Sequence, residues 1–174
     1  MVLRKFVIAV ACLLLISTGQ AQLFGAGAED AASKKLIKLL SKELDADRSE
    51  FALEKLDDHC FQSEFIEDVS KVYRDQKASG FVVSAKGKGR HDLFSYLIYF
   101  NEDREVELVK VTSYYSDHGG EIASKRWLEQ FVGYDGGDLD YGDEVQAISG
   151  ATLSAGSIVI GIREITILLQ DCNL

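Results

Sequence analysis

A series of short apolar segments, separated by brief polar breaks, constrains the fold more than any other feature of this sequence. The segments are rich in β-branched and aromatic residues, which are typical of strands. Strands joined by only a few residues pair antiparallel, because a parallel pair needs a long crossover connection. The sequence therefore predicts an antiparallel meander. The expected strands are 51–56, 68–74, 81–85, 93–100 and 106–112, and the main breaks read QKASG, KGKGRHD and NEDRE.

Helical patterns flank this series. Residues 33–44 place leucine and isoleucine at near-helical spacing with lysines between them. This predicts an amphipathic helix that packs onto the domain or, as the less favoured alternative, lies on a membrane surface. A helix is expected over 121–131, an acidic glycine-rich loop over 133–144, and a last helix over 153–169. The predicted fold class is α+β: a twisted, half-barrel-like antiparallel sheet packed with helices, with the C-terminal helix after the SGAT turn.

The N-terminal segment has the pattern of a secretory signal peptide. Arg4 and Lys5 precede an apolar run over 6–17, which is too short to span a bilayer, and small residues follow at 19–21. We expect cleavage after Ala21, with retention as a membrane anchor as the alternative. The predicted organisation is a signal peptide over 1–21, a leader with the amphipathic helix over 22–50, and one domain over 51–174. The protein would be exported, to the periplasm or the outer face of the cytoplasmic membrane.

The charge balance excludes one class of partner. The chain has 28 acidic and 19 basic side chains, and cleavage after Ala21 would remove Arg4 and Lys5. A chain this acidic lacks the phosphate-neutralising patch that nucleic-acid binding needs. Cys60 and Cys172 would remain in an oxidising compartment, where the sequence leaves open whether they form a disulfide.

Several stretches that resemble metal, phosphate or catalytic motifs are better explained as ordinary turns and loops. His59, His91 and His118 are scattered, so the sequence indicates no local zinc motif. The KGKGR stretch lies between two expected strands and is more typical of a hairpin turn than of a phosphate-binding loop. The acidic loop lacks the full ligand register of a calcium site. A small-ligand enzyme using Ser154 or His118 is the weakest alternative, since TLSAG lacks the first glycine of the hydrolase motif.

The stretch AISGATLSAGS, residues 147–157, joins the acidic loop to the last expected helix. Ser149 and Thr152 stand just ahead of that helix, and the small residues around them let a ligand approach the backbone closely. The first N–H groups of a helix have no partner within it and carry partial positive charge, so a phosphate is stabilised there. The residues alone leave two interpretations open, a helix cap and a phosphate-binding site.

A resemblance to a known family bears on that choice. The segment VQAISGATLSAGSIVIGI resembles the flavinylation motif of the FMN-binding domain family. That family includes components of two membrane redox complexes, the sodium-pumping NADH:quinone oxidoreductase and the Rnf complex. The segment GFVVSAKGKGRHDLFSYLIYFNEDREVELVKVTSYY resembles its strand core, and TSYYSDHGGEIASKRWLEQFVG is similar to its Gly-Gly-Glu turn and following helix. The resemblance covers residues 80–169, about half of the chain.

The resemblance implies a cofactor and the residues that hold it. In the family, a Thr hydroxyl is joined to FMN by a phosphoester bond that a flavin transferase installs, and the matching residue here is Thr152. The cofactor-binding residues that we expect are Ser149, Gly150, Ala151 and Thr152 in the motif, and His118, Gly119, Gly120 and Glu121 around the flavin. The family usually has an acidic residue six positions before the attachment Thr, where this chain has Gln146.

The function that the resemblance implies is that of an exported electron-transfer flavoprotein carrying covalent FMN. Its expected partners are the flavin transferase and membrane or extracytoplasmic redox proteins, and no nucleic acid. Such a protein is an electron carrier or a component of a redox complex rather than a stand-alone enzyme. The alternative, favoured by Gln146, is a non-flavinylated scaffold or binding module of an envelope redox complex.

Overall fold

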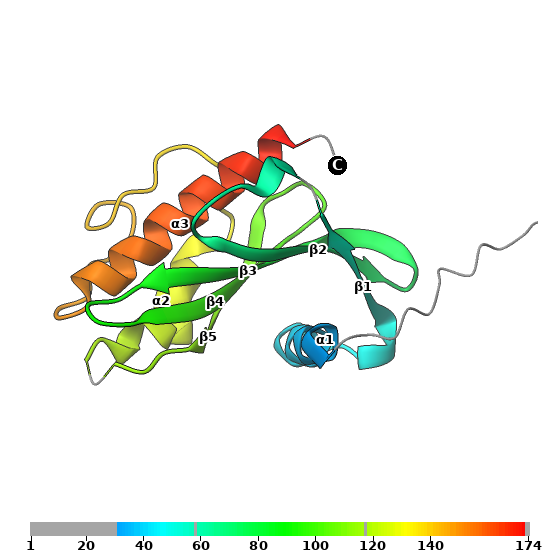
Figure 1. The fold of residues 1–174 in the computed structure, drawn as a ribbon, viewed down its shortest axis with the longest axis horizontal. Helices are drawn as coiled ribbons and strands as arrows, with labels where there is room; N and C mark the ends of the chain where they lie inside the picture. Colours follow the sequence, from blue (N-terminus) through cyan, green and yellow to red (C-terminus); the bar gives the residue numbers. More distant parts are fainter. Residues whose placement is uncertain (1–30, 58, 117, 173–174) are drawn as a thin grey trace, which may run out of the picture.

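The computed structural model describes residues 31–57, 59–116 and 118–172 (Figure 1). Five strands form one open sheet in the order β1-β2-β3-β4-β5, and every neighbouring pair is antiparallel. The predicted α+β fold with an antiparallel meander is therefore confirmed. The strands are β1 Phe51–Leu56, β2 Ile66–Arg74, β3 Lys77–Lys88, β4 Leu93–Phe100 and β5 Val106–Ser113.

Both faces of the sheet are covered, which explains why β4 is apolar without alternation. Phe94, Tyr96 and Ile98 belong to the larger core on one face, whereas Leu97 and Tyr99 belong to the smaller core on the other. A strand with only one buried face shows a polar residue at every second position. The continuous apolar run YLIYF, residues 96–100, therefore indicates an inner strand between two layers.

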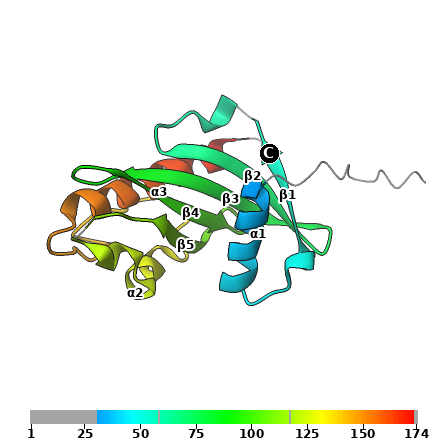
Figure 2. The same ribbon diagram turned by 60° about the horizontal axis from the view of Figure 1, so that its bottom comes forward.

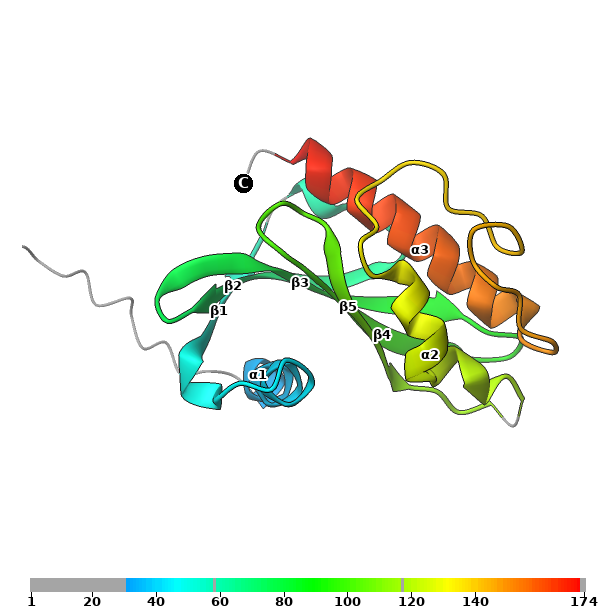
Figure 3. The same cartoon turned by 180° about the vertical axis from the view of Figure 1, so that it is seen from behind.

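The C-terminal helix α3, Thr152–Asp171, covers the face of the larger core (Figure 3). Its inward residues recur three or four positions apart, as they must on a helix packed against a sheet. They include Ala155, Ile158, Ile162, Ile165 and Leu169. By length and composition α3 could cross a membrane, but half of the apolar window is buried inside the domain. Its place in the core explains the apolar residues of the buried face, whereas Leu153, Ile160 and Ile167 are exposed.

The helix α1, Ala31–Glu43, covers the opposite face of the sheet (Figures 1 and 2). Ile37 and Leu40 of α1 pack with Phe51 of β1, Val72 of β2 and Leu97 of β4 in the smaller core. The amphipathic helix expected over 33–44 is confirmed, and it packs onto the domain.

The single helix predicted over 121–131 is wrong. Three one-turn pieces replace it: η3 Gly120–Ala123, α2 Lys125–Leu128 and η4 Glu129–Phe131. Ser124 interrupts the path with an extended backbone, φ −71° and ψ 135°, and its hydroxyl accepts a hydrogen bond from Trp127 N. Serine in this role caps a new helix rather than continuing the preceding one. The apolar spacing still reports burial, since Ile122, Trp127, Leu128 and Phe131 all lie in the larger core.

Strand β3 is longer than the sequence pattern predicts. It runs from Lys77 to Lys88 because residues on both sides of 81–85 continue to pair with β2 and β4. The turn to β2 is correspondingly tight, since Asp75 and Gln76 have φ values of 50° and 66°. Two successive residues with positive φ are the mark of a two-residue hairpin turn.

Two further one-turn helices flank β1: η1 Arg48–Glu50 and η2 His59–Phe61. Cys60 lies in η2, which packs against α3, and Cys172 is the buried residue directly after α3. The thiol of Cys172 is free, so the disulfide with Cys60 that the sequence left open is not formed in this structure.

A glycine of α3 makes room for a tyrosine of β4. A Cβ atom at Gly161 would overlap the hydroxyl of Tyr96 and would lie 3.1 Å from Cδ1 of Phe65. Among the described residues, the Tyr96 hydroxyl is the one buried side-chain polar atom without a hydrogen-bond partner. Burial raises the pKa of Tyr96, and the charge of Glu164 acts in the same direction. The contact of α3 with β4 thus needs a glycine, and it leaves one hydroxyl unsatisfied at a cost in stability.

We expect Gly161→Ala to lower the free energy of unfolding by about 1–3 kcal/mol, because the added methyl group overpacks a filled site. Gly156→Ala in the same helix is the matched control. A Cβ atom there meets nothing within 4 Å, so the better helix propensity of alanine should stabilise the protein. Tyr96→Phe should remove most of the cost of Gly161→Ala. Urea denaturation of the single and double variants measures this, and an equal cost with and without the hydroxyl would contradict it.

Candidate functional site

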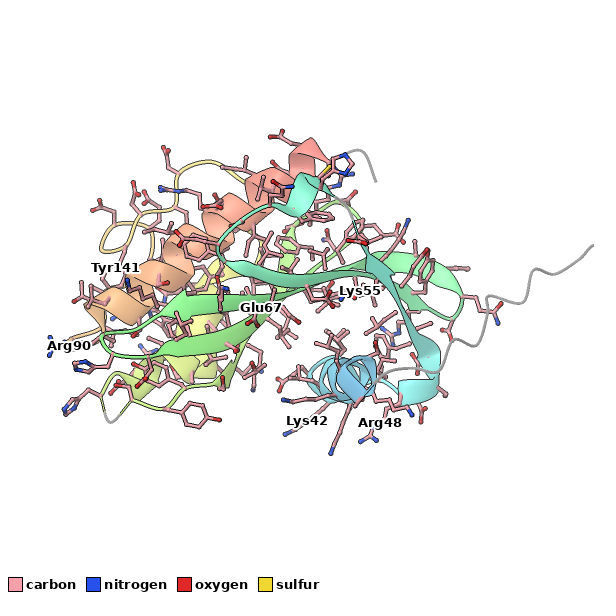
Figure 4. The ribbon with its side chains drawn as sticks, in the orientation of Figure 1. Lys42, Arg48, Lys55, Glu67, Arg90 and Tyr141 are labelled. Carbon is pink, nitrogen blue, oxygen red and sulfur yellow. The ribbon has the colours of Figure 1, made fainter. Side chains whose placement is uncertain are left out.

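Three segments that are distant in the sequence meet at one end of the sheet and line a cavity of about 860 Å³. They are the β3–β4 hairpin tip with the start of β4 (89–94), the stretch after β5 (114–116 and 118–121), and the turn that opens α3 (149–154). Figure 4 labels Arg90 at the hairpin tip. All of the cofactor-binding residues expected from the sequence line this cavity: Ser149, Gly150, Ala151, Thr152, His118, Gly119, Gly120 and Glu121.

Hydrogen bonds join the three segments beneath the cavity. The backbone N–H of Lys88, at the end of β3, donates to Ser157 Oγ in α3 at 2.8 Å. Tyr114, just after β5, donates from its hydroxyl to the carbonyl oxygen of His118 at 2.8 Å. The hydroxyl oxygens of Tyr114 and Ser154 lie 3.2 Å apart, so Ser154 can donate to Tyr114. The hairpin, the stretch after β5 and the first turn of α3 are therefore connected directly.

A close approach of two backbones completes the floor of the cavity. A Cβ atom at Gly119 would lie 2.6 Å from Cβ of Ala151 and 3.1 Å from the Tyr114 hydroxyl. Gly119 also has a φ of 77°, in the left-handed region that favours glycine. Ala151 is buried beneath it. Residues with larger side chains at these two positions would separate the turn over 118–121 from the start of α3.

Three side chains hold the segment that leads into the SGAT turn. Trp127 Nε1 donates to the carbonyl oxygen of Gln146 at 2.8 Å, and the N–H of Gln146 donates to Gln130 Oε1 at 2.8 Å. The hydroxyl of Tyr141 accepts from the N–H of Ile148 at 2.6 Å and donates to its carbonyl oxygen at 3.1 Å. The backbone is thus anchored on both sides of residue 147, while the Gln146 side chain remains exposed.

Thr152 is the first residue of α3, and it is exposed at the cavity. Its N–H and those of Leu153 and Ser154 find no acceptor among the described residues, as is usual in the first turn of a helix. No acidic side chain lies in that turn. The site therefore presents a free hydroxyl beside three unpaired N–H donors at the positive end of a 20-residue helix.

The rim of the cavity combines apolar and charged side chains. Three of the six exposed large apolar residues in the described part of the chain line it: Leu93, Tyr115 and Leu153, with exposed fractions of 61%, 82% and 59%. Arg90, His91 and His118 contribute basic groups, and Asp92 and Glu121 contribute carboxylates. The rim therefore offers exposed apolar surface beside basic and acidic groups.

Sequence reasoning misses the residues that the hairpin contributes. The KGKGR stretch is typical of a turn, and Gly89–Asp92 does connect β3 to β4. Nothing in its spacing shows that this turn lies beside the start of α3, because that proximity follows from the tertiary packing. Trp127, Gln130 and Tyr141 are missed for the same reason.

The acidic loop over 133–144 is a surface connection. Asp140 forms an ion pair with Arg163 of α3 at 3.1 Å, and Gln170 of α3 donates to the carbonyl oxygen of Asp135. Within residues 31–57, 59–116 and 118–172, no three His, Cys, Asp or Glu side chains are grouped so as to hold a metal ion. The loop is held to α3 by direct protein contacts.

Comparisons with known proteins show the fold. No family model matches the sequence, and no curated protein is significantly similar to it. Among solved structures, the crystal structure of NqrC from Shewanella oneidensis is similar, with a TM-score of 0.53 at 16% sequence identity. The match covers 79% of this chain and 96% of that chain. At this identity the likeness shows a shared fold.

We expect Gly119→Ala to destabilise the protein more than Gly150→Ala does. The two glycines have nearly equal positive φ values, 77° and 78°, so both substitutions carry a backbone cost of about 1–2 kcal/mol. Only at Gly119 does the new Cβ atom also meet Ala151, whereas at Gly150 nothing lies within 4 Å. Urea denaturation compares the two, and equal losses would show that the turn over 118–121 does not depend on this approach.

Proposed function

We propose that this protein is an exported electron-transfer flavoprotein whose FMN is joined by a phosphoester bond to the hydroxyl of Thr152. The observation that carries the proposal is the position of Thr152: it is exposed at a cavity and opens α3 within the motif that resembles the flavinylation sequence. The fold shared with NqrC supports it from a separate direction, because fold likeness does not depend on the motif.

The residues present fit a phosphate ester of a flat aromatic group. The unpaired N–H groups of Thr152, Leu153 and Ser154 can donate to phosphate oxygens, and the helix end favours negative charge. The cavity volume of about 860 Å³ lies within the usual range for organic ligands. Leu93 and Tyr115 offer exposed apolar surface against which a ring system can pack.

When bound, FMN supplies one- and two-electron redox chemistry, which the protein itself does not perform. The role of the protein is to orient FMN and to keep it accessible to redox partners. The ester bond at Thr152 prevents loss of the cofactor outside the cytoplasm, and the apolar side chains of the rim exclude water from the surface that they cover. His118 and Glu121, both exposed at the cavity, place an imidazole and a carboxylate near the ring, and these polar groups contribute to its potential.

Attachment of the group requires a second protein. A hydroxyl does not displace water from a phosphate monoester under mild conditions, so the donor must be a flavin phosphoanhydride. The Thr152 Oγ1–P bond forms as the anhydride P–O bond breaks, the second phosphoryl group leaves as a phosphate monoester, and the hydroxyl proton passes to a base of the transferase. We further propose membrane or extracytoplasmic redox proteins as electron partners. The expected signal peptide lies outside the described residues.

The alternative function, a scaffold or binding module without flavin, is favoured by one observation. Gln146 stands where the resembled family usually has an acidic residue, and its side chain is exposed rather than bonded within the domain. Its backbone N–H and carbonyl groups are the ones that Gln130 and Trp127 hold. A transferase that requires a carboxylate at this position would leave the chain unmodified.

Co-expression with a flavin transferase tests the attachment. We expect the intact mass to rise by one esterified FMN, and flavin absorbance to persist after denaturation and desalting. Thr152→Ala should lose both signals, because no hydroxyl remains to form the ester. Thr112→Ala is the matched control, since it removes an exposed threonine hydroxyl from β5, outside the cavity, and should keep the flavin. A wild-type chain that stays unmodified in the presence of an active transferase would contradict the proposal.

The variant Gln146→Glu distinguishes the flavoprotein function from the scaffold function. If the natural chain is a flavoprotein, we expect the wild type and Gln146→Glu both to be modified, with the variant at least as fast, because the charge usual in the family is restored. The hydrogen bonds of Gln130 and Trp127 involve only the backbone of residue 146, so the substitution leaves them in place. Mass spectrometry over a time course measures the rates. Modification of the variant alone would support the scaffold function for the natural chain.

A further inference from the structure

The exposed side of α1 concentrates positive charge on an acidic protein. Ile37 and Leu40 on the other side of the helix are buried against the sheet. The four lysines of α1 are all exposed, and at 100° per residue they fall within an arc of about 100°. None of them forms an ion pair with a described residue. These lysines are Lys34, Lys35, Lys38 and Lys42.

A groove of about 440 Å³ lies at the C-terminal end of this side, between α1 and η1. Lys42 and Arg48 extend away from the sheet there, as Figure 4 shows. The carboxylate of Asp47, which also lines the groove, accepts hydrogen bonds from the N–H and the hydroxyl of Ser49 at 2.8 and 2.7 Å. These bonds lower the pKa of Asp47 and hold its carboxylate in the cap of η1. The basic residues that line the groove are Lys38, Lys42 and Arg48.

We propose that this basic face, made of Lys34, Lys35, Lys38, Lys42 and Arg48, docks on an anionic phospholipid bilayer with a lipid phosphate in the groove. The positive face and the negative headgroups are complementary in charge. The Asp47 carboxylate in the groove offsets one of the five positive charges of this face. Acidic groups elsewhere on the protein oppose docking weakly, because salt screens charges over about 8 Å at physiological ionic strength. Only the face against the bilayer therefore contributes strongly.

The composition of the face favours lipid over a protein partner. The cores of protein interfaces are depleted in lysine and enriched in aromatic residues and arginine. Among the described residues, none of the exposed large apolar side chains belongs to α1. Flexible lysines without exposed apolar neighbours can form ion pairs with mobile lipid headgroups. They do not form the packed centre of a protein interface. This inference does not depend on the proposed cofactor, since the cavity lies at the β3–β4 hairpin and not at α1.

Sedimentation of the full chain with lipid vesicles tests the proposal. We compare vesicles of phosphatidylcholine alone with vesicles that also contain phosphatidylglycerol, at low and at physiological salt. Apolar binding through the N-terminal segment is present on both vesicles, so their difference isolates the charge-dependent part. The α1 substitutions then separate the share of the basic face from that of Arg4 and Lys5. We expect the wild type to prefer the anionic vesicles, and we expect added salt to weaken that preference. Lys38→Gln combined with Lys42→Gln should lower partitioning onto the anionic vesicles about 30-fold.

The matched control removes the same charge elsewhere. Lys125→Gln combined with Arg126→Gln changes two exposed basic residues of α2 and should leave the vesicle preference close to that of the wild type. All four residues are exposed, and circular dichroism checks that each variant is folded. Three outcomes would overturn the proposal: no preference of the wild type for anionic vesicles, no effect of the α1 substitutions, or an equal loss in both double variants. If the α1 substitutions had no effect on vesicle binding, the basic face would instead be assigned to an acidic protein partner.

Discussion

Apolar contact between α3 and one face of the sheet determines where each part of the candidate site lies. Ile158, Ile162 and Ile165 are buried against the sheet, and this places the first turn of α3 beside the end of β3. Because burial of apolar side chains is the largest favourable contribution to folding, the position of Thr152 is set by the core. The exposed residues of the cavity are therefore free to serve a ligand.

Small residues and hydroxyl groups then fix the exact positions of the segments that this packing brings together. Ser154 and Ser157 face the neighbouring segments from α3 and bond to Tyr114 and to the backbone of Lys88. Gly119 and Ala151 then allow two turns to meet without side chains between them. Each of these contacts adds little to the stability of the fold, since a hydrogen bond contributes about 1 kcal/mol net. Together they convert a general packing arrangement into a defined cavity.

Much of the fold was predictable because local chemistry and tertiary structure agree. The strand series carries the β-branched and aromatic residues of a buried sheet, and its short connections allow few topologies. The helix over 121–131 failed because apolar spacing reports burial, whereas the backbone of Ser124 follows its capping hydrogen bond. For the site, the motif residues were found as sequence patterns. Arg90, Trp127 and Tyr141 were not, because only packing brings them near residues 146–154.

The pairing of β3 with β4 has a mechanical consequence. The ladder from Phe81↔Phe100 to Lys88↔Leu93 is regular, whereas the pairings of β2 with β3 and of β4 with β5 each contain register shifts. A ladder without register shifts resists bending, so the tip of the β3–β4 hairpin keeps its position relative to the core. The first turn of α3 is likewise continuous with a long buried helix. Adjustment of the cavity to objects of different width thus falls to the third wall, residues 114–116 and 118–121, which has neither a strand ladder nor a long helix behind it.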